Sequence, residues 1–431
     1  MSIFSPADAA THAARVMRDC DEIAQHSETE GGLLRRYLSE PMHQVHSLAS
    51  RWMGELGMLV RTDDAGNLIG RRVATATDAT TADSAPVWII GSHLDTVPSA
   101  GRYDGVLGFV MGIATVRMLA ETALPFHIDV IGFSEEEGVR FQKPYLGSHA
   151  VTGTFDPNWL HRVDPQGISM RSCIEGFGLH PETIAAASYE PSQVRGFIEP
   201  HIEQGTMLSL AEDPVGAVSA IAGQTRSLVR FDGVAAHAGT TPMNPRSDAL
   251  VAAAAWILEV SRVSNQTADC RGTVGYADVQ PNVRNVIPDR VTLSLDLRHI
   301  DDTVREETVQ RLYRSAAEIA ESHHVAFEVL EEQQQTAARM DPILTDGLKE
   351  AMRSCGLSPR DMISGAGHDA GIMACHVPSA MLFIRQPRGI SHHRDEDVRT
   401  EDVAVGLQVL FQFFMEFADG DHAAGANPDP R

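Results

Sequence analysis

The stretch VWIIGSHLDTVPSAGRYDGVLGFVMGIATV, residues 87–116, gives the strongest indication of the fold. It begins with an apolar run, VWIIGS, that predicts a buried strand, and it leads into a helix expected over 105–121. Between them lie His93, Asp95 and Asp104, in a segment rich in glycine. Acids and an imidazole placed directly after a buried strand are costly to fold unless they bind something. The stretch therefore predicts an α/β unit with a functional site at a strand end.

A second strand end carries acidic residues. The run HIDVIGF at 127–133 predicts another strand, and Glu135, Glu136 and Glu137 follow it directly. Strand, helix and strand, with polar residues at the strand ends, is typical of an open α/β sheet whose sites lie beyond the carboxyl ends of the strands. Further elements of this domain are expected as helices over 6–28, 41–57, 341–355 and 401–418, strands over 58–62, 67–73 and 380–386, and a polar loop over 74–86.

A different pattern begins near Gly223. The runs SLVRFDGVA, GTVGYADV, RVTLSLDLRH and HVAFEVLEE predict strands, with helices expected over 245–262 and 302–322. The resulting order, strand–helix–strand–strand–helix–strand, predicts a ferredoxin-like unit that is complete in itself. We therefore expect one α/β domain, interrupted by a smaller α/β domain. The predicted boundaries are 1–222 and 338–418 for the large domain, 223–337 for the inserted domain and 419–431 for a disordered tail.

Composition excludes several classes of partner. The 431 residues include 58 acidic and 35 basic side chains, for a net charge of -23, which disfavours binding to nucleic acid or to an anionic membrane. The longest strongly apolar run, VLGFVMGIATV, is too short to span a bilayer, and no signal peptide is visible. The five cysteines are scattered without a CxxC pair, as in a reducing compartment. These features predict a cytoplasmic protein.

The residue types near the strand ends favour a metal site. Three consecutive glutamates would repel one another without a cation nearby. Histidine is also available, from His93, from His201 in EPHIEQG and from His392 in GISHHRDED. Mixed imidazole and carboxylate ligands suit Zn²⁺ or Mn²⁺. Each of these elements alone would be better explained as a solvated loop, and spacing does not show which acids are ligands; together they predict a metal centre.

Nine motifs in order carry a family resemblance. They are GSHLDTV, RYDGVLG, SEEEG, EPHIEQG, AHAGTTPM, PNVRNVIP, DLRH, SGAGHDA and GISHH, and they run from about residue 91 to 393. The chain resembles the M20 metallopeptidase-type hydrolases, in particular the amidohydrolase branch containing allantoate amidohydrolase, N-carbamoyl-L-amino acid hydrolase and β-ureidopropionase. The resemblance implies a large metallohydrolase domain, with a mixed sheet flanked by helices, interrupted by a ferredoxin-like lid or dimerisation domain. It also implies a homodimer.

The resemblance also implies a metal-ligand set. His93, Asp104 and His201 would hold one divalent ion, Zn²⁺ or Mn²⁺. Asp104, Glu137 and His392 would hold a second ion, with Asp104 bridging the two. Histidine at position 201 separates this branch from the peptidases, which usually have a carboxylate there. The family commonly continues with Asn-Pro where this chain has His393 and Arg394, so the shape of the adjoining loop is in question.

Catalytic roles follow from the same resemblance. Glu136 would be the general base that takes a proton from the attacking water, and Asp95 would orient the ring of His93. His237 in AHAGTTPM matches the family's oxyanion-stabilising histidine, which is often presented across the dimer.

Four further positions match residues that bind the substrate. Arg298 would clamp its carboxylate together with Asn285, while Gln204 and His368 would make additional contacts. Without the resemblance, Arg298 is better explained by a salt bridge at a strand end, and His368 by a buried structural histidine.

The implied reaction is hydrolysis of a ureido C–N bond in a small carboxylic acid, releasing ammonia and carbon dioxide. The segment CDEIAQHSETEGGLLRRYLSEP at 20–41 favours allantoate as the substrate, whereas RYDG is the form associated with N-carbamoyl-L-amino acids. A metallo-aminoacylase or dipeptidase, using the same metals and Glu136, is the main alternative. A non-catalytic binding module on the same scaffold is disfavoured because every expected ligand and the base are intact.

Overall fold

The computed structural model describes residues 6–75, 84–244 and 246–418. The chain forms two compact units, in which unit 1 comprises Met1–Ser219, Met340–Met362 and His368–Arg431, and unit 2 comprises Ala220–Arg339 and Ile363–Gly367. The expected tail over 419–431 lies outside the described residues, as does much of the expected loop over 74–86. Within the described part of the chain, no helix is long and apolar enough to cross a membrane.

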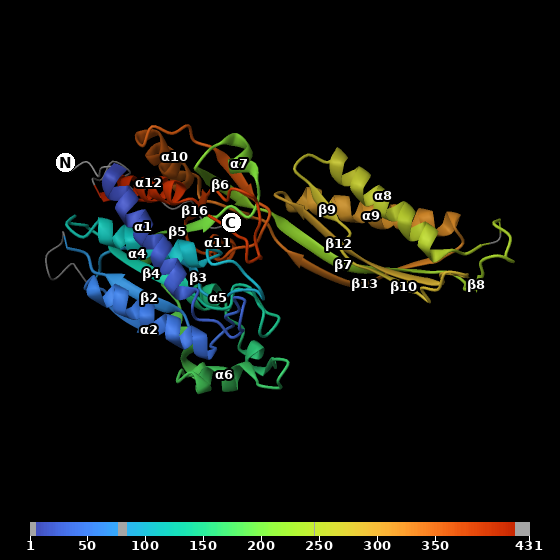
Figure 1. Cartoon of the computed structure of the whole chain (residues 1–431), viewed down its shortest axis with the longest axis horizontal. Coiled ribbons are helices and arrows are strands. Elements are labelled where there is room, and N and C mark those ends of the chain that lie inside the picture. The colour runs from blue at the N-terminus through green and yellow to red at the C-terminus, as the bar shows by residue number, and fades with distance from the viewer. Residues whose placement is uncertain (1–5, 76–83, 245, 419–431) are drawn as a thin grey trace. The chain divides into compact units, whose positions relative to one another are not determined.

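The large sheet is mixed, as predicted (Figure 1). Its path runs β1-β2-β4-β3-β5-β16-β6-β14, and β15 pairs with β6 beside that path. The four central strands β4, β3, β5 and β16 are mutually parallel, while β1, β2, β6 and β14 join the sheet by antiparallel pairing. The bounds are β1 Leu59–Thr62, β2 Leu68–Arg72, β3 Val87–His93, β4 His127–Phe133, β5 Val194–Ile202, β6 Val215–Ile221, β14 Ala338–Arg339, β15 Asp361–Ser364 and β16 Ser379–Ile384.

Helices cover the central strands, whose residues are buried on both faces, as parallel strands require. The helix α4, Val106–Met118, is apolar on every side because it packs on β3 and β5 and also on α1 and α12. In the same core, Trp88 meets the rings of Phe413, Phe414 and Phe417. The other helices of unit 1 are α1 Pro6–Ile23, α2 Glu40–Glu55, α5 Leu146–Val151, α6 Met170–Gly176, α7 Met207–Ala211, α10 Pro342–Ser354, α11 Asp369–Met373 and α12 Thr400–Ala418.

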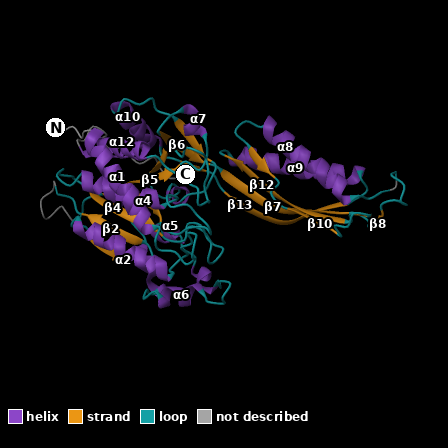
Figure 2. Ribbon diagram, viewed as in Figure 1, coloured by secondary structure: helices purple, strands orange, loops and turns teal. Residues whose placement is uncertain are grey.

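The main elements of unit 2 follow the predicted strand–helix–strand–strand–helix–strand order, with the second predicted strand divided into β9 and β10. Its antiparallel sheet runs β10-β12-β7-β13, with β9 also paired to β12, and the helices α8 and α9 lie on one face (Figure 2). Alternating residues of β7 and β12 point into the apolar core beneath these helices. The bounds are β7 Gly223–Asp232, α8 Ala249–Gln266, β9 Arg271–Thr273, β10 Ala277–Gln280, β12 Arg290–His299, α9 Asp302–Ser322 and β13 Ala326–Gln335.

The structure differs from the sequence expectations at several elements, and the short helices α5, α6, α7 and α11 and the strands β14 and β15 were not expected. The run GTVGYADV is two strands, because the backbone N–H groups of Gly275 and Tyr276 donate to the Ser294 hydroxyl instead of extending the ladder. A small two-stranded sheet, β8 Ala236–His237 and β11 Val286–Ile287, was not expected. The strands β5 and β6 were not expected either. In β5, the residues Glu199, Pro200 and His201 interrupt the apolar pattern, although the strand is buried along almost its whole length.

A close approach between α4 and β5 gives a stability prediction. A Cβ added at Gly108 would overlap the carbonyl oxygen of Pro200, so Gly108→Ala should lower the unfolding free energy by about 2 kcal/mol through overpacking. The matched control is Gly112→Ala on the same helix, where the nearest atom to an added Cβ is a methyl group of Val130 at 3.1 Å. We expect thermal unfolding to show a lower midpoint for Gly108→Ala than for Gly112→Ala. Equal midpoints would contradict the overlap.

Candidate metal centre

Three parallel strands bring the predicted ligands to one edge of the large sheet. His93 is the last residue of β3, the three glutamates follow β4, and His201 is the penultimate residue of β5. Because β4, β3 and β5 are adjacent, their carboxyl ends meet (Figure 1). The unpredicted strand β5 is therefore the element that carries His201 to the site.

The first cluster contains His93, Asp104 and His201. One potential ligand atom of each lies within 4.8 Å of those of the others, and the His201 Nε2 is 3.4 Å from the Asp104 Oδ1. The two imidazoles donate from Nδ1 to main-chain carbonyls, His93 to Asp95 at 3.0 Å and His201 to Ile202 at 2.9 Å. A carbonyl can only accept, so Nε2 of each ring keeps the lone pair that a metal ion needs.

The second cluster contains Asp104, Glu137 and His392. The His392 Nε2 lies 3.2 Å from the Asp104 Oδ2 and 3.5 Å from the Glu137 Oε1. The two oxygens of Asp104 thus face different histidines, one in each cluster. This arrangement suits a carboxylate that bridges two ions.

Several observations show that the residues fit divalent metal ions. His201 Nε2 is buried and has no hydrogen-bond partner in the described structure. Burial and the nearby charge of Asp104 raise the pKa of Glu137 to about 9, and burial with the neighbouring Glu137 raises the pKa of Glu136 well above its usual value. The hydrogen bond to Asp104 raises the pKa of His392 to about 9. These raised pKa values mean that burial and neighbouring negative charge disfavour the ionised carboxylates. Bound cations would stabilise the ionised forms.

Asp95 contacts the ring of His93 through its main chain and the glutamate turn through its side chain. Its main-chain carbonyl accepts from the ring of His93, whereas its carboxylate Oδ1 lies 3.7 Å from the same Nδ1. The carboxylate instead accepts the backbone N–H groups of Glu136 at 3.0 Å and Glu137 at 3.1 Å. Asp95 therefore holds the turn that carries these two glutamates, a turn that begins at Glu135 with a φ of 50°.

Close packing against His93 explains why glycine occupies the last position of the Tyr-Asp-Gly turn. Gly105 has a φ of 67°, and a Cβ added there would overlap the imidazole of His93. The chain must pass close to that ring because Asp104 and His93 belong to one cluster. Only glycine allows both the left-handed backbone and this close approach.

Sequence reasoning missed two buried acids beside the clusters. Glu199 accepts from the Ser92 hydroxyl at 2.7 Å and the Ala370 backbone N–H at 2.8 Å, and it shares a possible ligand group with His201 and His368. Glu396 accepts backbone N–H groups of the loop that carries Asp104. The sequence signal for Glu396 was an acidic residue four positions after His392. Glu199 was missed because Pro200 interrupts the apolar pattern of the strand that buries it.

Two predicted substrate residues lie beside the metal clusters in unit 1. Gln204 Nε2 donates to the Asp104 Oδ1 at 3.2 Å and to the Ser391 hydroxyl at 3.0 Å. The ring of His368 is buried and meets the ring of His201 edge-on, with centroids 4.5 Å apart.

The remaining predicted residues are divided between the two ends of unit 2. His237 and Asn285 are neighbours at the β8–β11 pair, where the Ala238 N–H donates to the Asn285 carbonyl at 2.9 Å. That pair lies just before the start of β12 at Arg290, whereas Arg298 lies near the end of β12. Eight residues of strand span about 26 Å. A small ureido acid therefore cannot contact Arg298 together with His237 or Asn285 of the same subunit.

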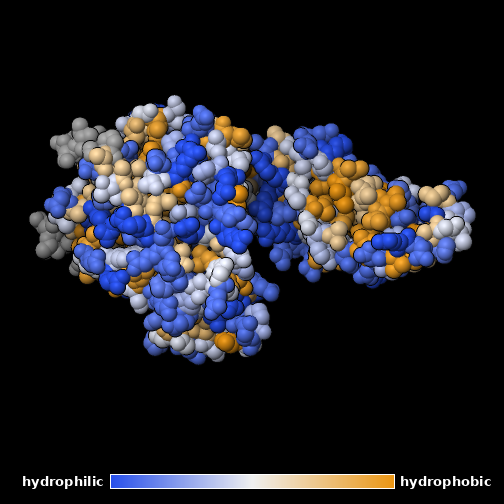
Figure 3. Space-filling model, viewed as in Figure 1, coloured by the Kyte–Doolittle hydropathy of each residue, from blue (hydrophilic) through white to orange (hydrophobic). Residues whose placement is uncertain are grey.

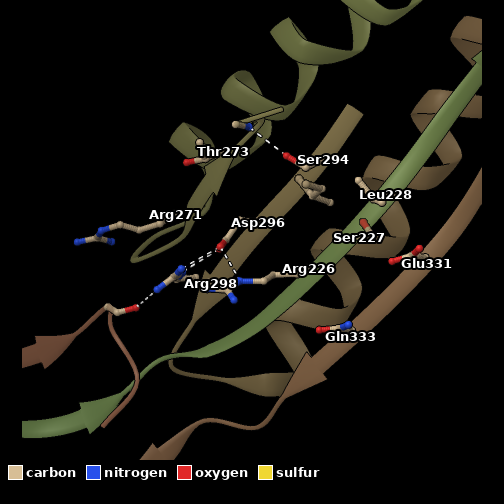
Figure 4. Close-up of a pocket in the computed structure, with 13 residues that line it drawn as sticks. Arg226, Ser227, Leu228, Arg271, Thr273, Ser294, Asp296, Arg298, Glu331 and Gln333 are labelled. Atoms are coloured by element: carbon tan, nitrogen blue, oxygen red, sulfur yellow. Dashed lines mark hydrogen bonds and ion pairs between the residues drawn. The ribbon is translucent and has the colours of Figure 1, made fainter. Parts of the chain in front are cut away.

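Arg298 lines a cavity of about 700 Å³ in unit 2 (Figure 4). Its Nε and Nη2 both donate to the Asp296 carboxylate at 2.8 Å, and its Nη1 donates to the Gly365 carbonyl at 2.6 Å. Arg226 also reaches Asp296, with its Nε 3.1 Å from the Oδ2. The guanidinium thus takes part in a strand-end salt bridge, which fixes its plane at the wall of the cavity.

Comparisons with known proteins agree with this architecture. The profile of the family described as Peptidase family M20/M25/M40 matches residues 89–416. The chain is 35% identical to an N-carbamoyl-L-amino acid amidohydrolase of Geobacillus stearothermophilus, over 91% of this chain and 95% of that protein. It is 34% identical to an allantoate deiminase of Arabidopsis thaliana, over 90% of this chain and 79% of that protein.

A solved structure shows the same fold. An amidase of the hydantoinase/carbamoylase family from Burkholderia multivorans superposes with a TM-score of 0.86 at 33% identity, covering 94% of this chain and 98% of the other. The chain therefore belongs to the M20/M25/M40 peptidase family, in its hydantoinase/carbamoylase amidohydrolase branch.

Proposed function

We propose that the protein hydrolyses the ureido C–N bond of a small ureido acid, allantoate or an N-carbamoyl-L-amino acid, and releases ammonia and carbon dioxide. The main support for the proposal is that the carboxylate of Asp104 belongs to two clusters of possible metal ligands. The buried Glu136 lies beside them, in a third cluster with His93 and Glu137. The names of the relatives at 35% and 34% identity support both substrates.

Each side chain has a definable task at these clusters. Divalent ions bound there would supply Lewis acidity, which polarises a carbonyl and makes water easier to deprotonate. Glu136 accepts a proton from the attacking water and returns it to the leaving nitrogen. Burial and the neighbouring Glu137 raise the pKa of Glu136, which favours its return of the proton to the leaving nitrogen. Asp95 keeps it in place through the backbone N–H groups of Glu136 and Glu137.

The substrate carboxylate is bound by Arg298 through the positive charge of its guanidinium. Because Nε and Nη2 of Arg298 donate to Asp296, the substrate carboxylate must share or replace those contacts. His237 stabilises the oxyanion, and Asn285 adds a polar contact. Because His237 and Asn285 lie a strand's length from Arg298, we propose that these two residues come from a second copy of the chain. A homodimer would then have two composite sites.

The surface of unit 2 supports a second copy as the partner. Leu250, Val251, Ile257 and Leu258 of α8 are 41%, 49%, 37% and 73% exposed, and their spacing places them on one side of the helix. Figure 3 shows an apolar patch over this helix. Apolar surface of this kind marks association sites.

Metal dependence and substrate can be tested in one assay. Ammonia release should be lost when the protein is stripped with a chelator and should return with Mn²⁺ or Zn²⁺. Ammonia release from allantoate alone would identify allantoate as the substrate. Ammonia release mainly from N-carbamoyl-L-amino acids would identify those compounds as the substrates. Cleavage of N-acetyl amino acids or dipeptides in preference to all ureido acids would instead favour the aminoacylase alternative.

The general base is tested by Glu136→Gln, which preserves shape but cannot accept the proton. We expect kcat to fall by at least about 100-fold with little change in KM, the usual size of a lost acid–base contribution. Metal content should be measured in parallel to confirm that the ions are retained. Full turnover by Glu136→Gln would contradict the mechanism.

Shared sites are tested by mixing two inactive variants. After joint refolding or co-expression of His237→Ala with Glu136→Gln, each mixed dimer should hold one intact composite site. Random pairing should then restore about a quarter of wild-type activity, because half the dimers are mixed and each has one working site. If all residues came from one subunit, mixing would restore nothing.

A further inference from the structure

Glu396 connects the two loops that supply Asp104 and His392. It lies four residues beyond His392, and its backbone N–H donates to the His393 carbonyl at 2.9 Å, so it belongs to the same tight turn. Its side chain turns inward, and the residue is only 3% exposed. A buried carboxylate on an otherwise exposed loop needs specific partners.

Those partners are backbone donors of the other loop. The Glu396 Oε1 accepts the N–H of Tyr103 at 2.9 Å and the N–H of Asp104 at 3.0 Å. Gly101 leaves room for this contact, because a Cβ there would overlap the Glu396 side chain. The hydrogen bonds therefore reach the backbone of the very residue whose carboxylate belongs to both clusters.

Neither loop is held by regular secondary structure at these positions. Asp104 follows the end of β3 and precedes α4, and His392 lies between β16 and α12 with a left-handed φ of 55°. Yet the Asp104 Oδ2 and the His392 Nε2 lie 3.2 Å apart, close enough that both would hold the same ion. A bond between the loops is the direct way to keep that spacing, and the Glu396 side chain provides it.

We infer that Glu396 is a positioning residue that holds Asp104 against His392 and so sets the geometry of the second metal cluster. The inference rests on the proposed function, since it assumes that these clusters bind metal. Glu396 acts through the backbone of Asp104, as an acceptor of two hydrogen bonds. A carboxamide oxygen could accept the same two bonds.

The test measures metal binding rather than turnover. Metal-free full-length protein is titrated with Mn²⁺, and the free ion is followed by electron paramagnetic resonance. We expect Glu396→Ala to weaken the weaker-binding Mn²⁺ by about 10- to 100-fold, the usual effect of losing a partner that supports a ligand. Glu396→Gln should bind within about 3-fold of wild type, because its amide oxygen restores the acceptor.

Asp63 offers a matched control. It is buried, and its Oδ1 accepts two backbone N–H groups, from Ala65 at 3.0 Å and Asn67 at 2.9 Å, in a loop without proposed ligands. Asp63→Ala should lower the thermal midpoint and leave Mn²⁺ affinity unchanged.

The outcomes are distinguishable. Wild-type Mn²⁺ affinity in Glu396→Ala would overturn the inference, as would a loss in Glu396→Gln equal to that in Glu396→Ala. An equal loss in Asp63→Ala would show that general destabilisation, and not positioning, weakens the site. Failure of the wild-type protein itself to bind Mn²⁺ would overturn the proposed function instead.

Discussion

The candidate metal centre depends on the carboxylate of Asp104. One oxygen lies 3.4 Å from His201 and the other 3.2 Å from His392, so the two clusters share this single side chain. A carboxylate buried this deeply is tolerated only with partners on each side. The conformation of the loop before α4 follows from that requirement. Gly105 lets the chain pass the ring of His93, and Glu396 holds the backbone of Asp104.

Main-chain groups orient three of the other polar side chains at the centre, those of His93, His201 and Asp95. Backbone carbonyls fix the rings of His93 and His201, and backbone N–H groups connect Asp95 to the glutamate turn. These backbone groups belong to buried parallel strands or to the turns directly after them. Rigid elements therefore set the geometry, as a site requires when charge must be placed to within a fraction of an ångström.

Unit 2 has an apolar core and, apart from it, a cluster of charged side chains. The apolar side chains of its sheet lie beneath α8 and α9, while Arg226, Asp296 and Arg298 form an ion-paired cluster at the wall of its cavity. The length of β12 keeps this cluster apart from His237 and Asn285. Under the proposed function, each end of unit 2 would hold part of a substrate site, and a second copy would supply the remainder.

The α/β class, the inserted strand–helix–strand–strand–helix–strand unit and the residue types of the centre were predictable from the amino-acid sequence. Local periodicity and the position of His93 and the glutamates after apolar runs are sufficient for that, because they depend on neighbours along the chain. Periodicity did not reveal β5, where Glu199 and Pro200 interrupt the apolar pattern. The three-dimensional structure was needed to show that β5 lies beside β3 and that the carboxylate of Asp95 holds the glutamate turn. It also separated His237 from Arg298. The physical reason is that strand order and loop-to-loop hydrogen bonds are long-range pairings, which no local pattern of residues encodes.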